Sequence, residues 1–397
     1  MCTKLFTTFL LMFSVCIILT GCVERMLYPI HEKGGSGYID RKGNVVVEPV
    51  HYYVHKFNNG VGKIYNQSYY SQNGVYEVYL VNTKGKTVFS LKTNTYVTVS
   101  FVAEGFAVVE TSDQKGDNCQ YYGFDGEPAF TNIYEKAEVF SYGLAAVKID
   151  GKWGYINKKG ELVINAVFDT AGHFFSENSA IVVYDEKWGV IDQTGQFTVS
   201  PKYSLPIVYY PDPHFPNTPF LLTMQKHENE HDNKYSSDCF IDISGKQIFP
   251  GTFMRATCFF EGLSRVGNEN GKYGYINRKG KLVIPYQFDR ADIFSEGLAS
   301  VKTDGKWGYI NRSGKVVFST HFDIVYDFHE GRAKVKIGEK FGYINKSGKL
   351  VIPVQFDSAE DFRGGLADVG IGDEYGYDEY GYIDKKGRFV WKTKGRE

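Results

Sequence analysis

The sequence lacks an excess of charge of either sign. Its 45 lysines and arginines are matched by 46 aspartates and glutamates, and these residues are spread along the chain without a run of one sign. Nucleic-acid binding depends on a concentrated positive surface, so this balance excludes a nucleic-acid partner. The sequence also shows no glycine-rich phosphate loop, no Ser-His-Asp order and no nucleophile elbow. We therefore expect no enzyme and no cofactor.

The sequence lacks a long hydrophobic run. Its one apolar stretch near the start, residues 9–19, is too short for a comfortable membrane span and is typical of a signal-peptide core. The stretch ends in Leu19-Thr20-Gly21-Cys22, which resembles the lipobox of bacterial lipoproteins. The resemblance implies cleavage between Gly21 and Cys22 and lipid attachment to the sulfur of Cys22. Two or three acyl chains on one residue give stable anchoring.

This segment predicts a body that lies outside the cytoplasm. An uncleaved anchor helix with a chance cysteine is the alternative, and it leads to the same side of the membrane. We expect a signal peptide over 1–21 and a lipid-anchored tether over 22–33. The protein would then be held in the cell envelope, on the periplasmic face or at the cell surface, with the membrane as a partner through Cys22.

Cysteine is also scarce. Of six cysteines, Cys2 and Cys16 leave with the signal peptide and Cys22 carries lipid, so three remain: Cys119, Cys239 and Cys258. An odd set in an exported chain allows at most one disulfide with a free thiol, which excludes a disulfide-dense scaffold. None of the three has a close-spaced partner for a thiolate metal site.

Aromatic residues and glycine, in contrast, are abundant. The chain contains 30 Tyr, 30 Phe, 4 Trp and 43 Gly, a composition typical of many short strands joined by tight turns. Roughly 375 residues remain after the targeting segment, too many for one ordinary compact core. The sequence therefore predicts an all-β chain with two domains or a repeat array.

A repeat of about 34 residues dominates the sequence. Three stretches that begin at Gly271, Gly305 and Glu339 superpose without gaps, and the same frame appears upstream at Gly151 and Glu186. An aromatic residue followed by glycine marks the units; the marker residues are Trp153, Gly154, Trp188, Gly189, Tyr273, Gly274, Trp307, Gly308, Phe341, Gly342 and Gly381. Weaker units lie at Gly37, Tyr79, Gln120 and Cys239. Together these make ten units.

The turn residues predict the strands of each unit. The pairs Asp150-Gly151 and Asp304-Gly305 tolerate the positive φ angles of a tight hairpin, so their flanking strands should be antiparallel. The segment 157–160, which runs from Asn157 to Gly160, predicts a second turn with glycine in the left-handed conformation. Each unit should hold three or four short antiparallel strands.

A unit this small cannot bury its aromatic side chains alone, so the units must stack. In a strand, Trp307 and Tyr309 point to one face while Gly308 and Ile310 point to the other. Glycine in a strand marks a close approach of backbone. We therefore expect the aromatic residue of one unit to cover the marker glycine of the next.

The repeated segments, such as KWGYINKKG and KWGYINRSG, resemble the WG-repeat family, also called the KWG-repeat family, of bacterial proteins. The resemblance covers nearly everything from residue 34 to residue 391. It implies a non-enzymatic repeat module, often on exported proteins and usually without a defined ligand. The units at Tyr79, Gln120 and Cys239 lack the marker glycine, so they are the least regular.

The sequence contains a literal H-E-x-x-H at residues 227–231. In zinc proteases this spacing works because a helix places both imidazoles on one face, beside a glutamate. Here no apolar stripe supports a helix around His227 and His231. The repeat frame instead places residues 221–224 and 240–242 in strands, so the segment is interpreted as an expanded hairpin loop. A metal site at the two histidines is the weaker alternative.

Six of the 12 prolines lie within residues 201–219. Proline does not contribute to a sheet ladder, so we expect an irregular inserted loop over this range. It carries Tyr209, Tyr210, His214 and Phe215. Rigid aromatic residues on a long loop form a candidate binding site, although inserted loops between repeats are often neutral.

Four aspartates recur after a phenylalanine at one register: Asp169, Asp289, Asp323 and Asp357. Glycoside hydrolysis uses two carboxylates a defined distance apart. A residue that recurs in several units more simply caps a turn, and we expect that role here.

The sequence predicts an array of units that fan out like propeller blades, either as a ring or as an open, curved solenoid. Ten units exceed the usual four to eight of closed propellers, so two subarrays, over 34–200 and 220–397, also remain open. The expected function is a membrane-anchored binding or scaffold module for a protein or a cell-envelope polysaccharide. The alternatives are a metal-dependent hydrolase that uses His227 and His231, and a purely structural spacer.

Overall fold

The protein is an all-β repeat array. The computed structural model describes residues 26–58, 60–66, 75–100, 102–113, 116–203, 207–209, 221–225, 237–250, 253–373 and 376–393. Within these ranges the regular elements are 37 strands, β1 to β37, arranged in nine antiparallel sheets. One sheet holds seven strands because β21 pairs with β22, and it contains two repeat units. The expected ten units are therefore present, and we number them as blades 1 to 10.

The first five blades contain the following strands. Blade 1 holds β1 (Tyr28–Glu32), β2 (Gly35–Ile39) and β3 (Val45–His51); blade 2 holds β4 (Tyr53–Val54), β5 (Val61–Tyr65), β6 (Tyr76–Asn82) and β7 (Thr87–Thr93); blade 3 holds β8 (Val97–Val99), β9 (Ala107–Asp113) and β10 (Gly116–Tyr122); blade 4 holds β11 (Lys136–Ala137), β12 (Leu144–Ile149), β13 (Lys152–Asn157) and β14 (Leu162–Phe168); blade 5 holds β15 (Thr170–Ser176), β16 (Ser179–Tyr184), β17 (Lys187–Ile191) and β18 (Phe197–Tyr203).

The other five blades contain these strands. Blade 6 holds β19 (Ile207–Tyr209), β20 (Leu221–Gln225) and β21 (Ser237–Ile241); blade 7 holds β22 (Phe253–Met254), β23 (Leu263–Gly267), β24 (Tyr273–Asn277) and β25 (Leu282–Phe288); blade 8 holds β26 (Arg290–Ala291), β27 (Leu298–Thr303), β28 (Lys306–Asn311) and β29 (Val316–Ser319); blade 9 holds β30 (Ile324–His329), β31 (Arg332–Ile337), β32 (Lys340–Ile344) and β33 (Leu350–Phe356); blade 10 holds β34 (Ser358–Ala359), β35 (Leu366–Asp373), β36 (Gly376–Asp384) and β37 (Phe389–Lys392).

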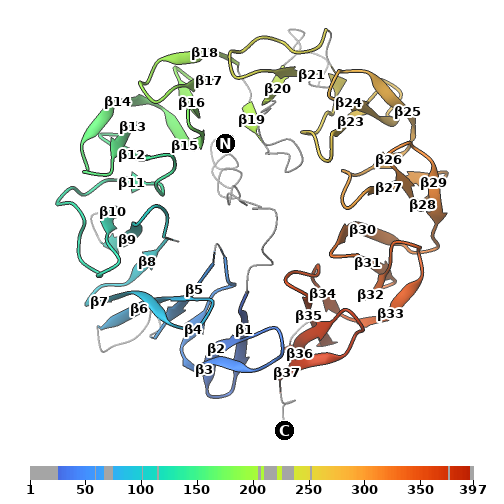
Figure 1. Cartoon of the computed structure of the whole chain (residues 1–397), viewed down its shortest axis with the longest axis horizontal. Helices are drawn as coiled ribbons and strands as arrows, with labels where there is room; N and C mark the ends of the chain where they lie inside the picture. The colour runs from blue at the N-terminus through green and yellow to red at the C-terminus, as the bar shows by residue number, and fades with distance from the viewer. Residues whose placement is uncertain are drawn as a thin grey trace.

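The blades form a closed ring, not an open solenoid or two subarrays (Figure 1). Blade 1 packs directly on blade 10 through a shared apolar cluster that includes Ile30, Ile39 and Leu366. Two hydrogen bonds cross the same junction: the Tyr28 hydroxyl donates to the Arg363 carbonyl at 2.9 Å, and the Tyr382 hydroxyl donates to the Pro29 carbonyl at 2.9 Å. The apolar faces and polar groups at the two ends of the array are therefore covered by each other.

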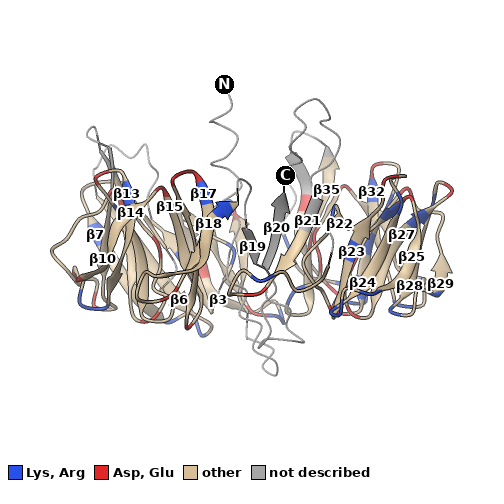
Figure 2. Ribbon diagram, turned by 90° about the horizontal axis from the view of Figure 1, so that it is seen from above, with Lys and Arg blue, Asp and Glu red and all other residues tan. Residues whose placement is uncertain are grey.

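Each four-stranded blade runs from the centre of the ring to its rim, with its first strand innermost and its fourth outermost (Figure 1). The loops therefore lie on two faces of the ring, which Figure 2 shows edge-on. One face carries the links between blades and the hairpins between second and third strands; we call it the crossover face. The opposite face carries the remaining turns, and we call it the turn face.

The predicted turns are confirmed. Asp150 and Gly151 adopt φ angles of 49° and 79°, and Asp304 and Gly305 repeat this geometry in blade 8. In the turn after β13, the Asn157 side chain accepts hydrogen bonds from the backbone N–H groups of Lys159 and Glu161. Local hydrogen bonding by Asn and the left-handed freedom of glycine explain why such turns can be predicted from sequence.

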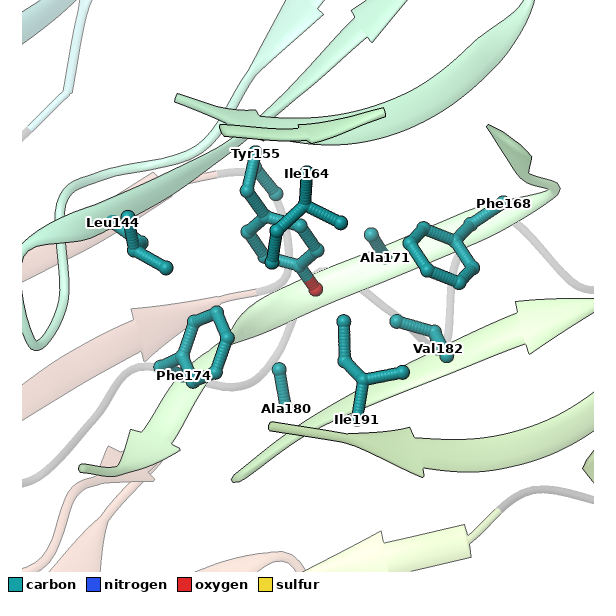
Figure 3. Packing of buried hydrophobic residues seen from close by; sticks show 10 residues of the cluster. Leu144, Tyr155, Ile164, Phe168, Ala171, Phe174, Ala180, Val182 and Ile191 are labelled. Carbon is teal, nitrogen blue, oxygen red and sulfur yellow. The ribbon is translucent and has the colours of Figure 1, made fainter. Parts of the chain in front are cut away.

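The core lies between blades, not within them. One cluster joins blades 4 and 5 and contains Tyr155, Ile164 and Phe168 from one sheet with Phe174 and Val182 from the next. Figure 3 shows these side chains facing one another, with the ring of Tyr155 among them. Alternate residues of each strand face opposite neighbours, so both faces of a blade must be covered.

A buried tyrosine on the third strand ties most blades to the next one. Its hydroxyl donates to a backbone carbonyl 17 residues further along the chain. The donor and acceptor pairs are Tyr38 with His55, Tyr121 with Glu138, Tyr155 with Gly172, Tyr275 with Asp292, Tyr309 with Tyr326 and Tyr343 with Glu360. The ring-closing bond from Tyr382 is made by the tyrosine at the same position of blade 10.

The expected role of the marker glycines is wrong. A side chain at Gly154 would meet the Ile164 carbonyl oxygen, 2.6 Å from an added Cβ, and this oxygen belongs to the outer strand of the same blade. The register between β13 and β14 shifts at this point, so the outer strand bulges over the glycine. The glycine that a residue of the preceding blade covers is instead the one in the turn after the third strand. In blade 4 this is Gly160, which Phe130 covers.

Two predicted boundaries are also wrong. Strand β1 begins at Tyr28, so residues 28–32 belong to the ring and not to a tether. The proline-rich range starts inside β18, which contains Pro201, and it includes β19. An outer strand has one unpaired edge and can accept proline there. Strands β20 and β21 lie where the repeat frame predicted them.

The substitution Gly154→Ala should lower the free energy of unfolding by about 1–3 kcal/mol, because the outer strand must move away from the new methyl group. Gly172→Ala is the matched control: Gly172 also lies in a strand, and its nearest neighbour would be 3.5 Å from the added Cβ. Chemical denaturation of both variants checks this. Equal stability of the two variants would contradict the close approach.

Candidate functional site

The recurrent aspartates clamp adjacent blades together on the crossover face. Asp289 links blades 7 and 8: one carboxylate oxygen contacts Lys272 Nζ at 2.6 Å, and the other accepts the Asp304 N–H at 2.9 Å. The hydrogen bond from Lys272 holds the pKa of Asp289 below its usual range. Asp169, Asp323 and Asp357 accept N–H groups of the equivalent hairpins, from Glu186, Gly338 and Gly372. The predicted turn-capping role is confirmed.

Glutamates form a second set of clamps on the turn face. Glu296 of blade 8 accepts the Gly331 N–H of blade 9 at 2.9 Å and pairs with Lys346 Nζ at 3.1 Å. Glu104 makes the same two contacts, with Gly143 and Lys158 of blade 4. The residues that define the repeat are thus engaged in joining blades, so a specific site is expected where a blade departs from the repeat.

The junction of blades 1 and 2 departs from the repeat in this way. In the register set by the marker glycine, His51 and Tyr52 occupy the positions of Phe168 and Asp169. The junction therefore has neither the clamp aspartate nor its lysine. In their place it carries a group of ring side chains on the crossover face, which we call the blade 1–2 patch: His31, Tyr52, Tyr53, His55 and Tyr65.

Four rings of the patch, those of His31, Tyr53, His55 and the buried Tyr65, form a continuous set of contacts. Tyr53 stacks on His31 with 5.7 Å between ring centroids and 19° between planes. Tyr53 also meets His55 edge-on at 5.0 Å, and His55 meets the buried Tyr65 at 5.5 Å. Tyr52 is 59% exposed and Tyr53 is 45% exposed. Rings of this size on the surface are available to a ligand.

The electrostatics of the patch favour neutral imidazoles. Burial lowers the pKa of His31, and burial together with the nearby Lys63 ammonium lowers the pKa of His55. Burial also lowers the pKa of Lys63 to about 8. Each neutral imidazole has one donor and one acceptor nitrogen. The His31 ring uses one of these with the Ser36 hydroxyl, at 2.8 Å. The arrangement can bind an uncharged ligand that carries hydroxyl groups.

A second group of acidic side chains lies in blades 8 to 10. Burial, followed by repulsion from Asp292 and Asp361, raises the pKa of Asp327 to about 7. Asp361 itself lies 3.5 Å from His329 Nε2 and 3.8 Å from Lys334 Nζ. Burial also raises the pKa of Asp368. Within the described ranges no group of His, Cys, Asp and Glu has an arrangement suited to a metal ion.

The expected lipidation and metal residues, and all but one of the expected binding-loop residues, lie outside the described residues. These are Leu19, Thr20, Gly21, Cys22, His227, His231, Tyr210, His214 and Phe215, whereas Tyr209 ends the short strand β19. The three late cysteines, Cys119, Cys239 and Cys258, are buried and form no disulfide. No helix in the part of the chain described here could cross a membrane.

Sequence reasoning missed the blade 1–2 patch. Its signal was present: at the register where four other units have Phe-Asp, the first unit has His51 and Tyr52. The first unit is weakly marked, since its glycine at position 37 follows a serine and not an aromatic residue. A search for known catalytic motifs does not detect a substitution of this kind.

Asp327 generates a prediction about pH. Its folded pKa is raised, so the folded state binds the proton more tightly than the unfolded chain, and stability falls as pH rises from about 4 to 7. The substitution Asp327→Asn should remove this slope and increase the free energy of unfolding at pH 8 by about 1–2 kcal/mol. At pH 4 the variant and the natural protein should be nearly equal.

Asp289→Asn is the control of opposite sign, because the lowered pKa of Asp289 stabilises the fold at neutral pH and loses that effect in acid. Chemical denaturation across this pH range compares the two variants. A constant stability difference between Asp327→Asn and the natural protein would contradict the raised pKa.

Comparison with solved structures agrees with the fold. A crystal structure described as the eukaryotic initiation factor is similar with a TM-score of 0.52 and 10% identity, covering 94% of this chain and 96% of that chain. BamB from Moraxella catarrhalis is also similar, at 10% identity over 68% of this chain and 90% of that chain, with a TM-score of only 0.33. At such identities only the first likeness bears on the fold, and neither bears on function.

No curated protein matches the sequence. The family described as WG containing repeat, in contrast, matches eight segments: residues 37–67, 125–153, 153–188, 188–205, 240–273, 273–307, 307–341 and 341–375. These segments cover more than half of the chain, and several of them run from the third strand of one blade to the third strand of the next, as 153–188 does from β13 to β17. The chain belongs to the WG-repeat family.

Proposed function

We propose that the protein is a non-catalytic, lipid-anchored binding module of the cell envelope, which holds a polysaccharide on the blade 1–2 patch. The observation that carries this proposal is the division between repeat residues, which join blades, and the patch, which replaces a clamp with exposed rings. Family membership and the ring fold support the coarser part, a repeat module that binds or scaffolds.

The chemistry of the patch supports a sugar ligand. The apolar face of a sugar ring packs on an aromatic side chain, and its hydroxyl groups need donors and acceptors beside that contact. Tyr53 supplies an exposed aromatic ring, and the imidazoles of His31 and His55 both contact it. The lowered pKa values of the two histidines keep both rings uncharged at neutral pH.

The position of the proposed anchor supports the same function. Cys22 precedes Met26 by four residues, a span of at most about 14 Å of extended chain. Met26 lies beside Gly364, in the hairpin of blade 10 on the turn face. The turn face would therefore lie toward the membrane, and the patch, on the crossover face, would point away from it.

Removing the exposed rings should weaken polysaccharide binding. We expect Tyr53→Ala to reduce affinity for a neutral envelope polysaccharide at least about fivefold, because the stacking surface is lost. Phe124→Ala is the matched control, since Phe124 is an exposed ring on another blade, at 55% exposure. Calorimetry with the purified full chain and a panel of neutral polysaccharides measures the effect.

Equal binding by Tyr53→Ala and Phe124→Ala would remove the patch from the proposal. Binding of an envelope protein, without any polysaccharide, that is lost in Tyr53→Ala would keep the site and change the ligand class. If the full chain binds neither a polysaccharide nor an envelope protein, the binding proposal fails and a purely structural spacer remains.

Lipidation is tested separately. Cys22→Ser should move the protein from the membrane fraction to the soluble fraction, because the acyl chains are attached to the sulfur. Cell fractionation with immunodetection measures the distribution, and Cys119→Ser serves as a control in which another cysteine is lost. Retention of Cys22→Ser in the membrane would favour an uncleaved anchor helix.

A further inference from the structure

Positive and negative residues are balanced along the sequence but not on the turn face of the ring. After the third strand of each blade, a short turn on this face leads to the outer strand. Six of these turns carry two or three lysines and arginines each, and only two of the six contain an acidic residue. They are residues 277–281 (NRKGK), 311–315 (NRSGK), 345–349 (NKSGK), 384–388 (DKKGR), 40–44 (DRKGN) and 82–86 (NTKGK).

The six turns are neighbours in the ring. They belong to blades 7, 8, 9, 10, 1 and 2, which follow one another across the closing junction (Figure 1). In the other four blades this turn always contains an acidic residue, and in blades 3 and 5, at residues 123–127 and 192–196, it contains no lysine or arginine. The cations of the six turns therefore form one continuous region, which we call the basic sector.

The cations of the basic sector are available to a partner. Lys279, Lys281, Lys315 and Lys349 are exposed, and none of the four forms an ion pair within the described ranges. The glutamate clamps of this face neutralise other lysines, since Glu330 lies 3.0 Å from Lys385 Nζ and Glu296 pairs with Lys346. The clamps thus leave an excess of positive charge on the turn face.

The crossover face of the same blades has no such excess. Each hairpin between the second and third strands of blades 7, 8 and 9 contains one acidic residue and one lysine, as Asp304 and Lys306 do in blade 8. The clamp aspartates add negative charge to this face, and two of them, Asp289 and Asp357, hold lysines in ion pairs of 2.6 Å. Separation of charge between the two faces gives the ring a preferred side for an anionic partner.

The start of the ring lies within the basic sector. Met26 is beside Gly364, in the inner hairpin of blade 10, and Tyr28 bonds to the Arg363 carbonyl of the same hairpin. The chain that precedes Met26 therefore joins the ring on the turn face, at the junction of blades 10 and 1. Only four residues separate Cys22 from Met26, a span of at most about 14 Å.

We propose that the basic sector is a docking surface for an anionic phospholipid bilayer, whose headgroup phosphates pair with the exposed lysines and arginines of the six turns. This inference rests on the proposed location in the cell envelope and adds the surface through which the ring meets the membrane. Clusters of lysine and arginine beside a membrane anchor bind anionic headgroups in this way.

The proposed contact would fix the orientation of the ring. Acyl chains on Cys22 hold the protein at the membrane, but a four-residue tether by itself lets the ring turn about it. Attraction between exposed charges acts over about 8 Å at physiological ionic strength, a distance that this tether allows. With the basic sector on the headgroups, the crossover face and its blade 1–2 patch point away from the bilayer.

The test compares anionic with neutral vesicles, and it uses the full chain with Cys22→Ser so that acyl chains do not mask the contact. This chain should bind phosphatidylglycerol vesicles at least about tenfold more tightly than phosphatidylcholine vesicles in a sedimentation assay. The ratio of the two affinities is the readout, because the apolar segment at residues 9–19 would bind both lipids. Equal affinity for the two lipids would overturn the proposal.

Two charge-reversed variants locate the contact. Lys315→Glu with Lys349→Glu alters two exposed turn residues of the basic sector and should reduce the preference for phosphatidylglycerol at least about tenfold. Lys33→Glu with Lys306→Glu makes the same change in net charge at exposed residues of crossover hairpins, and it should leave the preference nearly unchanged. Equal losses in the two variants would show that net charge, and not the turn face, causes the preference.

Salt dependence keeps the test decisive if a variant unfolds. Added sodium chloride should abolish the preference of the Cys22→Ser chain for phosphatidylglycerol, because the contact depends on exposed charges; a preference that persists in high salt would contradict it. Binding of soluble polyphosphate without any vesicle preference would assign the turn face to an anionic polymer and overturn the bilayer as its partner. If the vesicle preference is absent while polysaccharide still binds at the blade 1–2 patch, the docking surface fails and the proposed function stands.

Discussion

The structure depends on the need to cover both faces of every blade. Each sheet presents apolar side chains to the blade before it and to the blade after it, as Ile310 and Tyr309 do from adjacent positions of β28. An open array would leave one such face exposed at each end, at a cost of about 25 cal/mol per Å². Closure removes both ends at once, and Tyr382 then makes the bond at the closing junction that its counterparts make elsewhere.

This constraint explains the distribution of the other polar residues. The tyrosine hydroxyl, the aspartate clamp and the glutamate clamp each connect groups on adjacent blades, so they recur at several junctions between blades. A blade can depart from the pattern when another contact replaces the clamp. At the blade 1–2 junction the Tyr38 hydroxyl still bonds to His55, and the ring contacts of Tyr53 fill the crossover face. Variation can therefore create a site there without opening the ring.

Much of the fold could be predicted from the sequence because the turns are determined by residues that are close together in the chain. Asn157, Gly160 and the Asp150-Gly151 pair determine their turns within four residues. Ring closure could not be predicted, because a repeat of the same length can form either a ring or a solenoid. The angle between successive blades decides between them, and the repeat length does not determine that angle. The environment of Gly154 could not be predicted either, because a shift in register places the outer strand over it. The patch required comparison of one unit with the others.

Proline shows how one residue type has two meanings in this fold. In a central strand it removes a ladder hydrogen bond, which led to the expectation of a loop from residue 201. In an outer strand its missing N–H faces solvent, so Pro201, Pro285 and Pro353 leave the sheet intact and protect its edge. These prolines lie at two adjacent positions within the bulge that the outer strands share, and β14 keeps the same bulge with Asn165 and Ala166 at these positions. Comparison between units also identifies the blade 1–2 patch on the crossover face, because His51 and Tyr52 there replace the buried phenylalanine and the clamp aspartate of the regular units.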